Sequence, residues 1–224
     1  MAYDFSATEL IYTVRRSSRA RRVRVCVDAD AGIEVVLPQR APARAAASAV
    51  SELRPWIERR LDEIAAIRLH VAARGDTVPY LGATLRLVGE RGRMRVHRRG
   101  DELLVPVGAE RSAALERWYR RAARAEITPR VERAAGAVGR DVGSLTIRGQ
   151  RTRWGSCSST GALSFNWRLL LAPEDVLEYV VWHEACHLVV LDHSPRFWRL
   201  LERHLPGYRE PRTWLRRHGG TLVL

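Results

Sequence analysis

One stretch decides how the whole chain is interpreted: residues 176–191, which read VLEYVVWHEACHLVVL. Apolar residues occur on every side of a helix drawn through it, so the pattern predicts a buried helix rather than a surface one. The sequence Ala172-Pro173-Glu174-Asp175 comes directly before it. Proline at the first helical position sacrifices no hydrogen bond, and acidic side chains suit the positive first turn, so we expect the helix to begin here.

Three polar residues interrupt this apolar helix, His183, Glu184 and His187. Positions i and i+4 share one helix face, so both imidazoles can reach a single Zn²⁺ ion at about 2.0–2.1 Å. Glu184 is turned about 100° round the helix from His183, beside the ion, where it can accept a proton from water. This is the HExxH pattern of zinc hydrolases. The alternative, two core histidines and a chance glutamate, would leave an unpaired carboxylate buried at high cost.

We predict that His193 is the third zinc ligand. In an unbroken helix, a residue six positions after His187 would lie about 9 Å further along the axis and on the wrong side. Pro195 disfavours the α conformation at Ser194, and Ser194 is a good N-cap for a second helix. The chain is therefore expected to turn at residues 191–194, where His193 lies.

Other residues compete for places at the metal. Glu202 and His204 lie on the expected second helix, and Glu202 is the serious rival, because a glutamate from a following helix completes the zinc site of gluzincins. A purely structural zinc site would need a fourth protein ligand, for which Cys157 is the candidate. Cys186 is interpreted as a small buried side chain.

With these residues in view, the chain resembles the YgjP-like metallopeptidase family, a group of zincins related to the SprT-like proteases. Three segments carry the resemblance: residues 148–158, which end in RWGSCS, residues 164–173, and residues 192–198, which read DHSPRFW. The match is specific over residues 145–200 and looser elsewhere. Asp192 stands where asparagine is commoner in the family.

The resemblance implies a zincin-like core whose active-site helix lies under a small antiparallel sheet with an edge strand for an extended substrate. Residues 162–167 match that strand, so Phe165 and Asn166 are expected to contact substrate. Arg153 could hold a developing negative charge or an anionic group of the substrate. The alternative is an arginine that pairs with a carboxylate and pins its loop.

The rest of the chain predicts an α+β fold. Helical spacing covers residues 42–72, with a break or a start at Pro55, and continues from Ala109 to about Ala135. We expect a β-rich N-terminal half, residues 1–108, packed on the zincin-like core, residues 109–224, or one continuous domain. The expected strands cover residues 10–14, 23–27, 33–37, 84–88, 94–97, 103–105, 145–147 and 162–171, the first three as an antiparallel meander.

Composition bounds the function. The 224 residues carry 38 Lys+Arg, all of them arginine, against 25 Asp+Glu, for a net charge of +13. Since both halves are basic, the charge is diffuse, and any nucleic-acid binding is expected to be weak and salt-dependent. Three scattered cysteines fit a reducing compartment. With no signal-peptide pattern and no membrane-spanning run, a cytoplasmic protein is expected.

The leading hypothesis is a zinc-dependent metallopeptidase that acts on peptides or proteins, with Glu184 as general base. One alternative keeps the site but hydrolyses a nucleotide phosphoanhydride, although no Gly-rich phosphate loop is visible. A SprT-like DNA-associated protease is another alternative. A nucleic-acid-binding module with a structural zinc is the last, and in it Glu184 would have no purpose. The sequence sets no oligomeric state.

Overall fold

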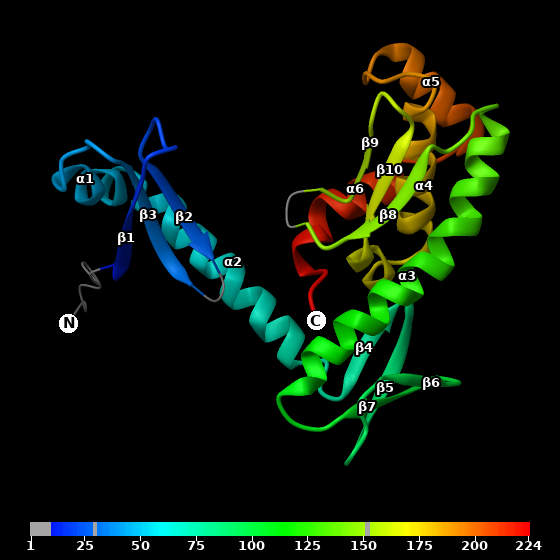
Figure 1. Cartoon of the computed structure of the whole chain (residues 1–224), viewed down its shortest axis with the longest axis horizontal. Coiled ribbons are helices and arrows are strands. Elements are labelled where there is room, and N and C mark those ends of the chain that lie inside the picture. Colours follow the sequence, from blue (N-terminus) through cyan, green and yellow to red (C-terminus); the bar gives the residue numbers. More distant parts are fainter. Residues whose placement is uncertain (1–9, 29–30, 151–152) are drawn as a thin grey trace, which may run out of the picture. The chain divides into compact units, whose positions relative to one another are not determined.

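The computed structural model describes residues 10–28, 31–150 and 153–224. Helices and strands both contribute to it, as the predicted α+β class requires (Figure 1). The chain divides into two compact units, Met1–His70 and Val71–Leu224. The division drawn from the sequence, after residue 108, falls inside the second unit, because the strands before it pack on the long helix after it.

The first unit is a three-stranded sheet with helices against one face. Its central strand is β3 (Gly32–Pro38), which pairs antiparallel with β2 (Arg24–Asp28) and parallel with β1 (Tyr12–Ser17). The predicted antiparallel meander is therefore wrong for β1, which lies on the far side of β3 instead of forming a hairpin with β2. Residues 29 and 30 of the expected β2–β3 turn lie outside the described residues.

Alternation along β3 buries the side chains of Ile33, Val35 and Leu37. They form one cluster with Ala46, Val50 and Ile57 of α1 (Arg44–Glu52) and α2 (Arg54–Ala72). The expected helix break is confirmed, because α1 ends before Leu53 and Pro55 is the second residue of α2, where no helical hydrogen bond is lost.

The second unit begins with a four-stranded sheet in the order β4-β5-β7-β6. Its strands are β4 (Thr77–Tyr80), β5 (Ala83–Glu90), β6 (His97–Arg99) and β7 (Glu102–Pro106). This sheet packs on α3 (Glu110–Ala137), where the rings of Tyr80, Trp118 and Tyr119 lie against one another. β4 was not expected from the sequence, and the strand predicted over 94–97 begins only at His97.

A second sheet of this unit has the order β8-β10-β9. β8 (Ser144–Arg148) runs parallel to β10 (Ala162–Asn166), and β9 (Gly155–Cys157) runs antiparallel to it, so the sheet is mixed rather than antiparallel as predicted. The predicted strand over 162–171 ends at Asn166. There the side-chain oxygen accepts a hydrogen bond from the Arg168 backbone and caps the short 3-10 helix η1 (Trp167–Leu171).

Three helices follow the second sheet: α4 (Glu174–His187), α5 (Pro195–His204) and α6 (Arg209–His218), before the short η2 (Gly219–Thr221). Arg130 of α3 ties α4 in place through ion pairs to Glu174 and Glu178. Within the described residues, no helix combines the length and the apolar character that crossing a membrane requires.

Candidate metal centre

The helix α4 presents the HExxH residues as the sequence predicts. It starts after Pro173, which takes the N-cap position, and it ends at His187, a turn earlier than the apolar run. Val176, Val180 and Ala185 are among its buried residues, so apolar contacts hold the helix on several sides. A helix anchored in this way holds His183 and His187 in fixed positions on one face.

After α4, the chain turns back in the predicted place. The Val190 amide donates to the Cys186 carbonyl at 3.0 Å, which tightens the end of the helix. The Asp192 carboxylate then accepts a hydrogen bond from the Ser194 amide at 2.9 Å, which closes an Asx turn. Ser194 is the N-cap of α5 and Pro195 its first residue. This turn carries His193 back toward α4.

The three predicted ligands lie together. The Nε2 atoms of His183 and His187 are 3.2 Å apart, those of His187 and His193 are 3.2 Å apart, and those of His193 and His183 are 3.1 Å apart. Among the His, Cys, Asp and Glu side chains of the described residues, these three are the group with metal-ligand spacing. The three nitrogens form a nearly equilateral triangle.

This triangle fits a tetrahedral zinc ion. Nitrogens at zinc-bonding distance in a tetrahedral shell are separated by about 3.3 Å, close to the observed spacings. His187 Nδ1 lies 2.9 Å from the Val190 carbonyl oxygen, which can only accept, so Nδ1 carries the proton. The Nε2 atom of His187 therefore offers its lone pair to the triangle. Lone pairs at such short range repel one another unless a cation lies between them.

The surroundings keep His183 and His187 neutral. Phe197 of α5 stacks on His187, with ring centroids 4.4 Å apart, and makes an edge contact with His183 at 4.9 Å. Burial first, and then the nearby His187 and His193, lower the pKa of His183 to about 3. Burial also lowers the pKa of His187. Neutral imidazole is the form that binds a metal ion.

Glu184 follows His183 directly in α4 and is a buried acid. Its side chain is 5% exposed, and within the described part of the chain no donor forms a hydrogen bond or ion pair with its carboxylate. Burial raises the pKa of this carboxyl to about 8. A buried carboxylate without a partner is costly, so its presence points to chemistry rather than packing.

Gly155 of β9 makes the space that Glu184 occupies. A Cβ atom added at this position would lie 2.5 Å from the Glu184 Oε1 atom and 2.6 Å from its Cγ atom. The sequence analysis assigns no role to Gly155. The only hint in the sequence is a single glycine between a bulky and a polar residue in the RWGSCS segment, and the contact with Glu184 is visible only in the fold.

The rival ligands lie elsewhere. Glu202 forms an ion pair with Arg209, with a nitrogen–oxygen distance of 2.9 Å, and His204 stacks on Trp182 at 5.2 Å. The Cys157 thiol donates to the Ser158 carbonyl, and it is outside the histidine group. No fourth protein ligand of a structural site is thus present among the described residues.

The predicted substrate contacts turn out differently. β10 lies in the middle of its sheet with both edges paired, so the prediction that it is an edge strand is wrong. Phe165 is 1% exposed in the core, and the Asn166 amide donates to the Gln150 and Arg153 carbonyls at 2.6 and 3.2 Å. Arg153 itself is exposed, and no carboxylate of the described residues pairs with it.

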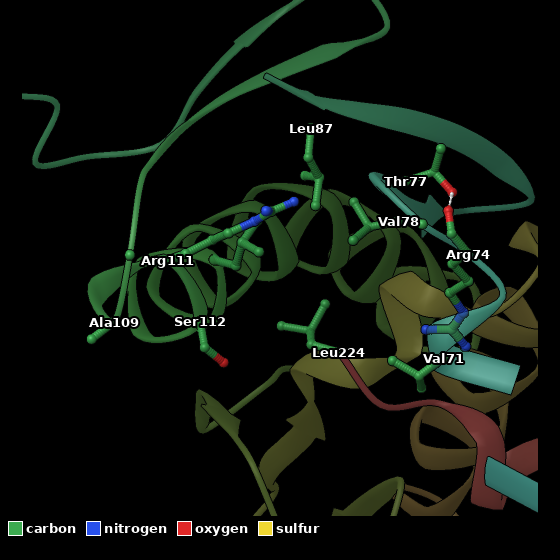
Figure 2. A pocket seen from close by; sticks show the side chains of 12 residues that line it. Val71, Arg74, Thr77, Val78, Leu87, Ala109, Arg111, Ser112 and Leu224 are labelled. Carbon is green, nitrogen blue, oxygen red and sulfur yellow. Dashed lines mark hydrogen bonds between the residues drawn. The ribbon is translucent and has the colours of Figure 1, made fainter. Parts of the chain in front are cut away.

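A separate cavity of about 280 Å³ lies away from the histidines (Figure 2). Its apolar wall includes Val78 and Leu87. Its two arginines are already engaged: Arg74 donates to the Thr221 and Val223 carbonyls, and Arg111 pairs with Asp76. The cavity contains no nucleophile–base pair, so it adds nothing to the chemistry of the centre.

These features define a protein of the α+β class with a candidate metal site, three converging histidines, two of which lie on a helix that also carries a buried glutamate. The chain belongs to the YgjP-like metallopeptidase family, whose domain model matches residues 21–218. Family membership makes it a hydrolase of the metallopeptidase type, and it implies a metal cofactor and peptide or protein substrates.

Other comparisons add little. A comparison with curated proteins finds no match. Among solved structures, the crystal structure of the metallopeptidase zymogen of Pyrococcus abyssi abylysin is similar at 23% identity, with a TM-score of 0.37. The similarity covers 41% of this chain and 93% of that chain.

Proposed function

We propose that this protein is a zinc-dependent peptidase in which His183, His187 and His193 hold the ion and Glu184 is the general base. The convergence of the three Nε2 atoms at 3.1–3.2 Å carries the proposal, and the buried Glu184, which has no partner among the described residues, supports it. The bond between His187 Nδ1 and the Val190 carbonyl supports it, because a second hydrogen bond of this kind orients a ligating imidazole.

Bound zinc supplies a Lewis acid that polarises a peptide carbonyl and lowers the pKa of water to about 7. The Glu184 carboxylate accepts the proton of the attacking water and can return it to the departing amide nitrogen. Its apolar surroundings raise the pKa of the carboxyl and so strengthen it as a proton acceptor.

An extended substrate is proposed to lie along the outer edge of β9. β10 fills one edge of β9, and the other edge has no strand neighbour in the sheet. Main-chain hydrogen bonds there would align a peptide next to Glu184, because Gly155 of β9 directly abuts that side chain. Arg153 lies two residues before Gly155 of β9, and its guanidinium, which pairs with no carboxylate of the described residues, is proposed to meet an anionic group of such a peptide.

Glu184→Gln tests the proposal. The amide keeps the shape of the side chain but cannot accept the proton, so we expect peptide hydrolysis to fall by about 10²–10⁴-fold with zinc still bound. Activity on a peptide library and zinc content by atomic absorption are the two measurements. Glu202→Gln is the matched control and should keep both. Normal turnover in Glu184→Gln would contradict the proposed base, and lost zinc would place Glu184 on the metal.

A further inference from the structure

A continuous group of rings extends from the histidine triangle to helix α6. Trp198 of α5 stacks on His193, with ring centroids 5.6 Å apart and planes inclined by 30°. Tyr208, which caps α6, stacks on Trp198 at 5.6 Å and 15°. Tyr208 also stacks on Tyr179 of α4, one turn before His183. The side chains next to the proposed metal position are therefore stacked aromatic rings.

Arg212 of α6 lies against the Trp198 ring of this group. Its guanidinium carbon is 4.5 Å from the centroid of the Trp198 ring. The residue is exposed, and no carboxylate of the described residues forms an ion pair or hydrogen bond with it. A guanidinium stacked on a ring keeps its N–H groups directed outward in its own plane, where they can bind a carboxylate through two parallel hydrogen bonds.

Arg209, one turn earlier on α6, differs from Arg212 because it forms an ion pair within the protein. It also lies over an aromatic ring, that of Tyr208, at 5.1 Å. Its nitrogen, however, is 3.1 Å from one Glu202 oxygen and 2.9 Å from the other. The charge of Arg209 is thus balanced within the protein, whereas that of Arg212 is balanced by nothing in the described structure.

Trp198 links Arg212 to the histidine triangle. The Arg212 guanidinium carbon lies 4.5 Å from the centroid of the Trp198 ring, and the His193 ring lies 5.6 Å from the same side chain. An anion bound to Arg212 would therefore lie within one aromatic ring of a proposed zinc ligand.

We propose that Arg212, held over Trp198 and backed by Tyr208, forms a subsite for a carboxylate of the peptide substrate beside the histidine triangle. The inference rests on the proposed peptidase function and names its substrate class: peptides with an acidic group close to the scissile bond. A single guanidinium matches the one charge and planar shape of a carboxylate. A nucleoside triphosphate carries several charges and would need further cations or a phosphate-binding loop.

Binding of active-site probes tests the subsite without relying on turnover. The probes are short peptide hydroxamates that chelate zinc and differ only in a C-terminal carboxylate or carboxamide; a third has an amidated terminus and an aspartate side chain. Titration calorimetry on the zinc-loaded full chain should show about tenfold tighter binding of an acidic probe than of the amide, since charge-assisted hydrogen bonds carry this much affinity. The carboxylate and aspartate probes tell a terminal acid from a side-chain acid.

Arg212→Ala should abolish the preference for an acidic probe and leave the affinity of the amide probe unchanged, and Arg212→Lys should restore part of the preference. Arg209→Ala, the matched control, should keep it. Equal affinity for all probes in the unmodified protein, or no binding of any, overturns the subsite. If Arg212→Ala weakens the binding of acidic and amide probes equally, the subsite is also overturned, because Arg212 would then only support the packing of the helix.

The same probes separate the two proposals. If the preference depends on Arg212 but no peptide is hydrolysed, the subsite stands and the peptidase proposal fails. If Glu184-dependent hydrolysis occurs without any preference, the peptidase stands and the subsite fails. Hydrolysis of nucleoside triphosphates that is lost in Arg212→Ala would assign the arginine to phosphate and overturn the carboxylate subsite.

Discussion

Two buried polar side chains of the second unit have opposite surroundings. Asn166, where β10 meets η1, is 3% exposed, and its amide makes hydrogen bonds to Gln150, Arg153 and Arg168. Glu184, in the last turns of α4, is 5% exposed and has no partner among the described residues. A satisfied buried group stabilises the fold, whereas a buried carboxylate without a partner costs stability and is a candidate functional group.

Next to Glu184→Gln, the largest loss of activity is expected from Gly155→Ala. The new methyl group would lie 2.5 Å from the Glu184 carboxylate and 2.6 Å from its Cγ atom. The whole Glu184 side chain must therefore shift. A displacement of about 1 Å can lower kcat/KM by about 100-fold. Peptide hydrolysis and zinc content measured together check this, and zinc should remain bound.

Gly136→Ala is the matched control for that substitution. Gly136 lies inside α3, and a Cβ atom there would meet nothing within 4 Å. Alanine is the better helix former, so a gain of about 0.5–1 kcal/mol in the free energy of unfolding is expected, with unchanged activity. If both alanine variants lose activity equally, the contact between Gly155 and Glu184 does not explain the loss.

Asn166→Ala should act on stability instead. It removes a buried side chain that binds the Gln150 and Arg153 carbonyls and the first turn of η1. We expect a loss of about 2–4 kcal/mol in the free energy of unfolding, measured by urea titration. Gln39→Ala, at an exposed position, should change it by less than about 0.5 kcal/mol. If Asn166→Ala is as stable as the original protein, Asn166 does not have the stabilising role that distinguishes it from Glu184.

Cys157→Ser is expected to have the smallest effect. Burial raises the pKa of this thiol to about 11, with a contribution from the charge of Glu184, and the protonated thiol is a poor zinc ligand. Zinc stoichiometry and affinity should therefore stay unchanged. Weaker zinc binding in this variant would favour a structural site with cysteine as fourth ligand.

The sequence was most informative where local rules act. The period of α4, the spacing of His183 and His187 and the break before Pro195 depend on neighbours along the chain, and the structure has all three. The return of His193 to α4 also follows from such rules, because a proline and an N-cap residue stop one helix and start the next.

Pairing between distant strands was not predictable in this way. β9 is three residues long, Gly155–Cys157, and carries no strand pattern, so nothing in the sequence placed it between β10 and the solvent edge. The assignment of residues 162–167 to an edge strand, and of Phe165 and Asn166 to substrate contacts, came from the family resemblance, and no strand pattern at β9 corrected it. The parallel pairing of β1 with β3 was missed for the same reason, since register depends on tertiary contacts.

The choice of third ligand is decided by the zinc affinity and stoichiometry of His193→Ala and Glu202→Ala, measured together. We expect His193→Ala to lose the ion or bind it far more weakly, while Glu202→Ala keeps one zinc per chain at the original affinity, since Glu202 pairs with Arg209. Zinc lost only in the Glu202 variant would contradict the triangle of histidines and give the third position to the glutamate.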